Sequence, residues 1–198
     1  MSFTLTELAG KIAGIMVALS YIPYIVGILR RKTHPSRASW FIWASTNFLI
    51  SGSYYLSGAK DTLWISLAFM FGSSVIAIMS IWFGEGGWEL LDRICLVGAG
   101  LGIVLWFILK NPQVVLFVSI FNIFLGMLPT FKKAHFNPQH ESKLAWGMCF
   151  IGSIANIIAI DNISFSIATY PIVTFLEVGI IVFLLFLSPH RKMKIVKS

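Results

Sequence analysis

The polar groups best suited to chemistry in this sequence lie inside long apolar segments. Glu177 interrupts the last of these segments, from Asn162 to Leu187. If that segment crosses a bilayer, a carboxylate inside it costs several kcal/mol, ~2.5–3.5 for the related aspartate, so the group must be protonated, paired or turned toward a cavity. Helical spacing places Tyr170 and Thr174 on the face of Glu177. Glu177 therefore has two interpretations of equal weight, a proton-coupling or cation-recognising group and a protonated acid hydrogen-bonded to another helix.

Aromatic and amide side chains share a helix face in two other apolar segments, Ala38 to Ala59 and Leu144 to Ile160. An amide in a membrane must face protein or water, and an aromatic wall beside a few polar groups is typical of small-molecule pockets. Asn47 has an equally weighted alternative as a contact between helices. Trp40 and Trp146 lie near segment ends, where aromatic residues more often anchor a helix at the membrane surface. The residues on these faces are Trp40, Trp43 and Asn47 in the first segment and Trp146, Ser153 and Asn156 in the second.

The composition indicates a membrane protein. Hydrophobic residues make up 57% of the chain and charged residues 12%, and the mean hydropathy is +0.83. Too few polar atoms are therefore available to cover a soluble domain. An apolar stretch of about 17–25 residues crosses the hydrocarbon core as a helix. Seven segments meet or approach that length, the fourth only if it includes Glu89, Asp92 and Arg93. They are Ile12 to Leu29, Ala38 to Ala59, Thr62 to Gly84, Ile94 to Leu109, Asn111 to Phe131, Leu144 to Ile160 and Asn162 to Leu187.

Lysine and arginine residues are distributed unevenly between the two ends of these segments. Most of them fall in the first, third and fifth loops and the C-terminal tail, whereas the opposite side carries Lys11, Lys60 and Lys110. Positive residues stay on the cytoplasmic side of membranes, so we expect an N-terminus outside, a cytoplasmic C-terminus and an inner or plasma membrane location. This topology explains the net charge of +7 without nucleic acid as a partner.

The chain contains one motif twice. Tyr21-Ile22-Pro23-Tyr24 is followed by a basic segment, Pro35 and Trp40, and Leu128-Pro129-Thr130-Phe131 is followed in the same way by Pro138 and Trp146. Each tryptophan lies seventeen positions after the first proline of its motif, so one offset of 106 residues superposes the two segments. We interpret this as an internal duplication, which is typical of transporters built from repeats.

The duplication divides the seven predicted helices into groups of three, one and three. Two directly joined copies with three crossings each would point in opposite directions, and one extra helix restores parallel repeats. We therefore predict an all-α membrane protein with seven transmembrane helices, arranged as two parallel three-helix bundles joined by a linker helix. The predicted units are residues 1–86, a linker helix over 87–110, residues 111–189 and a basic cytoplasmic tail over 190–198.

Three prolines fall inside predicted helices. A proline there removes one hydrogen bond and frees the carbonyl four residues earlier, as Pro171 does for Ile167. The matching places of Pro23 and Pro129 favour a role as pivots between the two repeats. Pro171 has no counterpart in the first repeat, so we interpret it as a static bend.

A chain of 198 residues with this three-one-three arrangement, an outside N-terminus and these prolines resembles the SWEET sugar facilitators. It also resembles the wider group of PQ-loop transporters and the nicotinamide riboside transporters. The resemblance implies alternating access with four hinge prolines. The family's PQ dipeptide reads Pro23-Tyr24 and Pro129-Thr130 here, and the paired asparagines of SWEET helices three and seven are absent, so the resemblance does not identify the solute as a sugar. The four matching prolines are Pro23, Pro35, Pro129 and Pro138, and the third and seventh helices offer Ser73, Ser74, Tyr170 and Thr174.

Motifs for catalysis or metal binding are absent from the sequence. His34, His135, His140 and His190 fall in loops or the tail without ligand spacing, and no GxSxG, Walker or dinucleotide motif occurs. Two cysteines inside apolar segments give no sign of a disulfide. We therefore expect no enzyme activity, metal or cofactor.

The predicted function is a transporter that moves a small polar solute, such as a sugar, an amino acid or a vitamin-like molecule, by alternating access with or without proton coupling. The alternative is a membrane receptor or sensor on the same scaffold, which resembles the KDEL receptors and binds without transport. An intramembrane enzyme is a distant third, and homo-oligomerisation stays open. The predicted cavity lining consists of Trp43, Asn47, Ser153, Asn156, Tyr170, Thr174 and Glu177.

Overall fold

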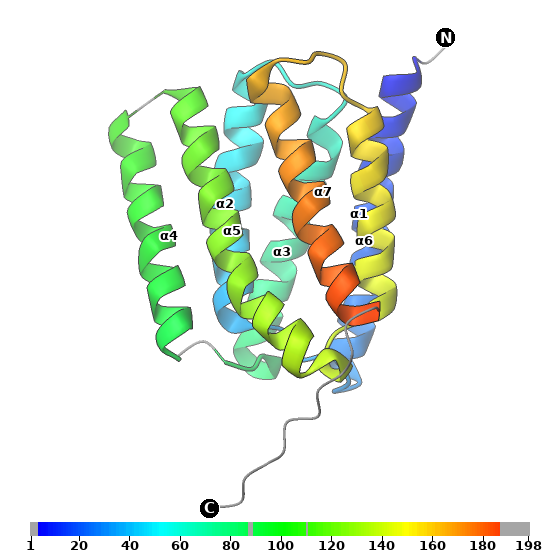
Figure 1. Ribbon diagram of the computed structural model, residues 1–198, viewed down its shortest axis with the longest axis vertical. Helices are drawn as coiled ribbons and strands as arrows, with labels where there is room; N and C mark the ends of the chain where they lie inside the picture. Colours follow the sequence, from blue (N-terminus) through cyan, green and yellow to red (C-terminus); the bar gives the residue numbers. More distant parts are fainter. Residues whose placement is uncertain (1–3, 87–88, 110, 187–198) are drawn as a thin grey trace, which may run out of the picture.

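The structure is a computed structural model that describes residues 4–86, 89–109 and 111–186 (Figure 1). The predicted tail over 190–198 and the two ends of the predicted linker helix, residues 87 and 110, lie outside the described residues. The described part is all-α, as predicted, and contains seven α-helices. They are α1 (Leu5–Leu29), α2 (Arg37–Leu56), α3 (Leu63–Phe83), α4 (Leu90–Leu109), α5 (Pro112–Phe136), α6 (Lys143–Ile158) and α7 (Phe165–Phe186), with the 3-10 helix η1 (Pro138–His140) before α6.

Five of these helices are long and apolar enough to cross a membrane, namely α1, α3, α4, α7 and α5 from Leu116 onward. They indicate a multi-pass membrane protein. Of the two other predicted spans, α6 has only 16 residues. α2 has 20 residues but a more polar composition. Its polar side chains are largely turned toward neighbouring helices, and the buried ones are Ser39, Thr46, Asn47, Ser51 and Ser53.

The helices extend beyond the apolar segments where polar residues stabilise their ends. α1 begins at Leu5 because the Thr4 hydroxyl accepts a hydrogen bond from the backbone N–H of Glu7. Lys11 then pairs with Glu7 at 3.1 Å, one turn apart. Asn111 caps the start of α5, since its Oδ1 accepts from the backbone N–H of Val114 at 3.5 Å.

Successive helices run in opposite directions, so α1, α3, α5 and α7 point the same way (Figure 1). α1 packs against α3 and α6, α2 against α3 and α5, and α7 against α5 and α6. α4 stands at one side of the bundle, in contact with α5 and α2 (Figure 1). Its residues Ile94, Val97 and Leu101 are more than half exposed, as expected for a surface that faces lipid.

α1 approaches the loop before α3 most closely at Gly10. A Cβ atom there would lie 2.1 Å from the carbonyl oxygen of Asp61, whereas a Cβ atom at Gly52 would meet nothing within 4 Å. Gly10→Ala is therefore expected to lower the free energy of unfolding by about 1–3 kcal/mol through overpacking. Gly52→Ala, the matched control, should be neutral or slightly stabilising. Thermal unfolding of both variants in detergent measures the difference, and equal midpoints would contradict the close approach.

Candidate functional site

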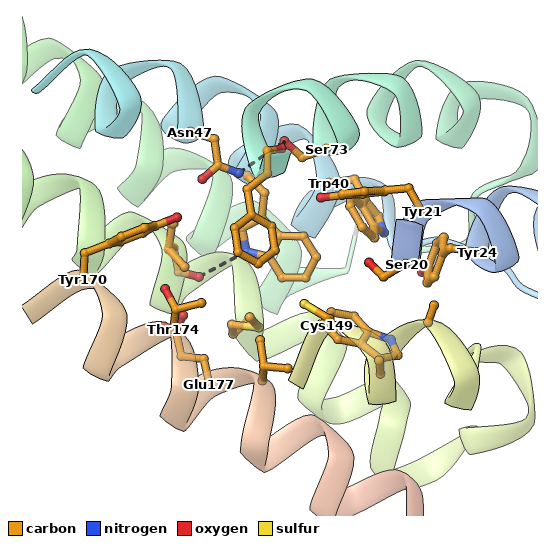
Figure 2. Close-up of a pocket in the computed structure, with 17 residues that line it drawn as sticks. Ser20, Tyr21, Tyr24, Trp40, Asn47, Ser73, Cys149, Tyr170, Thr174 and Glu177 are labelled. Atoms are coloured by element: carbon orange, nitrogen blue, oxygen red, sulfur yellow. Dashed lines mark hydrogen bonds between the residues drawn. The ribbon is translucent and has the colours of Figure 1, made fainter. Parts of the chain in front are cut away.

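A cavity lies between the helices of the bundle and is lined by residues of α1, α2, α3, α5, α6 and α7 (Figure 2). The cavity has a volume of about 60 Å³, counted as the space that the centre of a water molecule can reach. That is room for about four to six water molecules, and a larger solute needs the surrounding helices to move apart. The lining is mainly aromatic and consists of Ser20, Tyr21, Tyr24, Trp40, Trp43, Asn47, Phe69, Ser73, Ile123, Met127, Ala145, Trp146, Cys149, Tyr170, Thr174, Glu177 and Val178.

The structure brings five of the seven predicted lining residues together at this cavity: Trp43 and Asn47 from α2, and Tyr170, Thr174 and Glu177 from α7. The other two, Ser153 and Asn156, are buried in α6 but do not line the cavity. Ser153 Oγ donates to the carbonyl of Phe150 at 2.7 Å, and the Asn156 amide has no partner among the described residues.

Aromatic rings from three helices form one wall of the cavity. The ring centroid of Trp40 lies 4.9 Å from that of Trp43 and 5.1 Å from that of Tyr24, and Trp43 lies 6.3 Å from Trp146. Trp40 and Trp146 are only 5% and 6% exposed. Their interpretation as membrane-surface anchors is therefore wrong, because an anchor must present its ring to the lipid headgroups.

Two glycines allow aromatic rings of the cavity lining to lie close to neighbouring helices. Trp43 Nε1 donates to the carbonyl of Ile123 in α5 at 3.3 Å, and a Cβ atom at Gly126 would lie 2.6 Å from that nitrogen. A Cβ atom at Gly72 in α3 would lie 2.0 Å from the ring of Tyr21. The missing side chains therefore let Trp43 and Tyr21 pack directly on neighbouring backbones.

Asn47 joins two helices and also lines the cavity. Its Nδ2 donates to Ser73 Oγ in α3 at 3.2 Å, and Ser73 Oγ donates in turn to the carbonyl of Phe69 at 2.6 Å. Asn47 Oδ1 is buried and has no partner among the described residues. The contact between helices is thus present, and one acceptor of the amide stays available at the cavity.

Glu177 lies beside Thr174 on α7, on the other side of the cavity from Tyr24 (Figure 2). It is 4% exposed, and its Oε1 has no partner among the described residues. A buried carboxyl group is costly unless it is hydrogen-bonded, or unless a proton or a cation neutralises it. Glu177 Oε1 therefore leaves an unsatisfied buried oxygen at the cavity.

Comparisons of the chain with protein-family models, with curated proteins and with solved structures found no match. The chemistry of the cavity is therefore inferred from its own side chains. Among the described residues, no group of three or more His, Cys, Asp or Glu side chains is arranged to hold a metal ion.

The carbonyl of Ile167, which Pro171 deprives of its helical partner, is satisfied from α2. The Tyr54 hydroxyl donates to it at 2.6 Å. Tyr54→Phe is therefore expected to lower the free energy of unfolding by about 1–2 kcal/mol, because a buried carbonyl is left without a donor. In a Pro171→Ala background the loss should be smaller, since the alanine N–H restores the helical hydrogen bond. A double-mutant cycle of unfolding in detergent checks this, and equal losses in both backgrounds would contradict it.

A charged network adjoins one end of the cavity, and the sequence analysis did not predict it. Trp146 Nε1 donates to Glu141 Oε2 at 2.8 Å. The Glu141 side chain, 1% exposed, forms an ion pair with Lys133 at the end of α5, whose side chain is 7% exposed. Lys133 Nζ also donates to the carbonyl of His34 and lies 3.9 Å from Glu85 Oε1. The aromatic wall is thus connected to a buried ion pair.

The same network joins three loops. His140 Nδ1 lies 3.0 Å from Glu85 Oε2, and the backbone N–H of His34 donates to the carbonyl of His140 at 3.1 Å. The backbone of Glu85 pairs with that of Pro35 and Arg37. The sequence contains one indication of this network. Glu85, Lys133 and Glu141 all fall in loops or helix ends that are predicted on the same side of the membrane.

Proposed function

We propose that this protein is a membrane transporter that moves a small polar solute by alternating access. One observation carries the proposal: residues of six helices line a cavity between them that is rich in aromatic rings, and in it Asn47 Oδ1 and Glu177 Oε1 are buried without a partner among the described residues. Such groups are costly in a static core and gain a partner when a polar solute enters. The cavity thereby has the chemistry of a binding site at the middle of the bundle.

The proposed architecture is two parallel three-helix units, α1 to α3 and α5 to α7, joined by α4. In this architecture α1 corresponds to α5, α2 to α6 and α3 to α7. The contact between α1 and α6 then corresponds to the contact between α5 and α2. In the same way, the α1–α3 contact corresponds to the α5–α7 contact and the α2–α3 contact to the α6–α7 contact. This correspondence supports the duplication, and it supports rocking of one unit against the other around the cavity.

The proposed closing element is the charged network around Lys133 and Glu141. Opening the cavity toward this end separates Lys133 from Glu85 and from the carbonyl of His34, which belong to the first unit, while the helix prolines absorb the change in direction. The carbonyl of Pro35 accepts from Glu85 N–H at 2.9 Å and Pro138 begins η1, so both loop prolines lie at the network. The proposed hinges are Pro23, Pro35, Pro129 and Pro138.

The distribution of lysine and arginine supports placing this network at the cytoplasmic end of an inner or plasma membrane protein. A receptor that binds without transport is the competing function. The basic residues of the loops at Arg30 to Lys32 and Lys132 to Lys133 would fit such a receptor, but Lys132 pairs with Glu89 at 2.5 Å and Lys133 with Glu141. We therefore keep the receptor as the alternative that the following assay distinguishes from transport.

A two-stage assay tests transport. Purified protein in detergent is screened by thermal shift against sugars, amino acids, vitamins and small cations, and each stabilising solute is then offered in radiolabelled form to sealed proteoliposomes. We expect at least one stabilising solute to enter the vesicles. Asn47→Ala should weaken its binding about ten-fold, since the solute loses a buried acceptor. Ser45→Ala, an exposed position in the same helix, serves as the control. Stabilisation without flux would favour the receptor.

A further inference from the structure

Several polar groups of the cavity lining are already hydrogen-bonded within the protein. Five of the donor groups donate to protein oxygens: Ser20 to the carbonyl of Val17, Ser73 to that of Phe69, Trp43 to that of Ile123, Trp146 to the carboxylate of Glu141, and Asn47 to the hydroxyl of Ser73. Among the lining groups left without a partner in the described residues, Asn47 Oδ1 and the ionised form of Glu177 Oε1 can only accept, and the Tyr24 hydroxyl can accept or donate. The free groups therefore suit a ligand that brings hydrogen-bond donors or positive charge.

The cavity also presents several aromatic rings. Tyr21, Trp40 and Trp43 pack with mutually tilted ring planes, the Trp40 and Trp43 rings at 84° to each other. Because edge-on packing leaves ring faces uncovered, these faces can contact a ligand. The face of an aromatic ring carries negative charge density and attracts a cation within about 6 Å of its centroid. Tyr170 adds a ring beside Glu177 on α7.

We infer that the solute of the proposed transporter is a small monovalent organic cation of the alkylammonium class, held between the carboxylate of Glu177 and the aromatic wall. This inference rests on the proposed function and names its substrate class. A sugar needs hydrogen-bond partners for every hydroxyl, and five donors of this lining already donate to protein oxygens. A quaternary ammonium group needs no hydrogen bonds, and a primary one brings donors for Glu177 and Asn47.

Glu177 is the only Asp, Glu, Lys, Arg or His among the described lining residues. The other titratable groups that face the cavity are Tyr21 and Tyr24 from α1, Cys149 from α6 and Tyr170 from α7, while α2, α3 and α5 contribute none. One positive charge thus neutralises the enclosed carboxylate, and either a proton or the cation supplies it. When the cation binds, the Glu177 O–H bond breaks, the proton leaves to water and the carboxylate pairs with the cation. The two ions therefore exchange at one site.

Choline and its uncharged isostere 3,3-dimethylbutan-1-ol test this inference in the full-length protein. Quenching of intrinsic tryptophan fluorescence in detergent measures binding, because three tryptophans line the cavity. We expect choline to bind at least about ten-fold more tightly than the alcohol. Glu177→Gln should remove most of that preference and leave alcohol binding within about two-fold, whereas Glu89→Gln, at an exposed carboxylate, should change neither. Thermal unfolding of each variant confirms that it is folded.

Uptake of radiolabelled choline and glucose into proteoliposomes separates the two proposals. Choline binding with choline flux supports both. Choline binding without flux of any solute overturns transport and leaves the cation site standing. Flux of glucose or another neutral solute without choline binding overturns the cation site and leaves transport standing. Equal affinities for choline and the alcohol, or no binding of choline by a folded protein, also overturn the cation site.

Discussion

Replacing Lys133 with methionine is expected to lower the free energy of unfolding by about 3–5 kcal/mol, the usual cost of breaking a buried ion pair from one side. The Glu141 side chain is 1% exposed, so water cannot replace the lysine. The hydrogen bond from Trp146 Nε1 to Oε2 of this carboxylate would remain, but it does not neutralise the charge. Reversible unfolding in detergent, followed by circular dichroism, measures the loss.

The neighbouring lysine provides a matched control. Lys132 pairs with Glu89, but these side chains are 50% and 64% exposed, so Lys132→Met should cost no more than about 1 kcal/mol. Adding Glu141→Gln to Lys133→Met should recover part of the stability, because the uncompensated charge disappears. If the two lysine variants unfold alike, the ion pair does not hold this end of the bundle together.

Glu177→Gln is expected to abolish the pH dependence of uptake. If the cation displaces one proton from Glu177, raising the pH on the side from which it enters favours uptake. At subsaturating solute concentration, the uptake rate should rise by up to about ten-fold per pH unit. This rise is expected over the pH range in which Glu177 is protonated in the empty site. Glutamine keeps the shape of the side chain but exchanges no proton, so its uptake should stay flat with pH. The same pH response in both proteins would exclude Glu177 as the coupling group.

The control for this experiment is Asn47→Ala, which alters the same cavity without removing a titratable group. Its uptake should be lower than that of the parent and should keep the parent's pH response. Initial rates in proteoliposomes, with the internal pH clamped and the external pH varied, give both profiles. A loss of pH response in both variants would point to general damage of the cavity.

The helices and their apolar character could be predicted from the sequence, because both follow from local composition. Segment length and hydropathy placed all seven helices. α1 and α5 run further than predicted, where capping or polar residues extend them, as at Thr4 and Lys132 to Phe136, whereas α2, α6 and α7 are shorter than the predicted segments by two or three residues at one end. Helical spacing also placed Tyr170, Thr174 and Glu177 on one face, and all three line the cavity.

Spacing along one helix says nothing about which neighbour that face meets, and this limit explains what the sequence analysis missed. Trp40 and Trp146 were interpreted as surface anchors because they lie near segment ends, yet helix rotation buries both beside Trp43. The same spacing put Ser153 and Asn156 on the face of Trp146, but only Trp146 reaches the cavity.

Sequence alone determined an all-α chain with long apolar helices and polar groups within them, since these properties depend on residues close together in the chain. Only the tertiary structure decided which of those polar groups meet. The contacts of Lys133 with Glu141 across a loop, of Asn47 with Ser73 and of Tyr54 with the carbonyl of Ile167 depend on helix order and rotation. Packing between distant segments sets that order and rotation, and no local pattern encodes them.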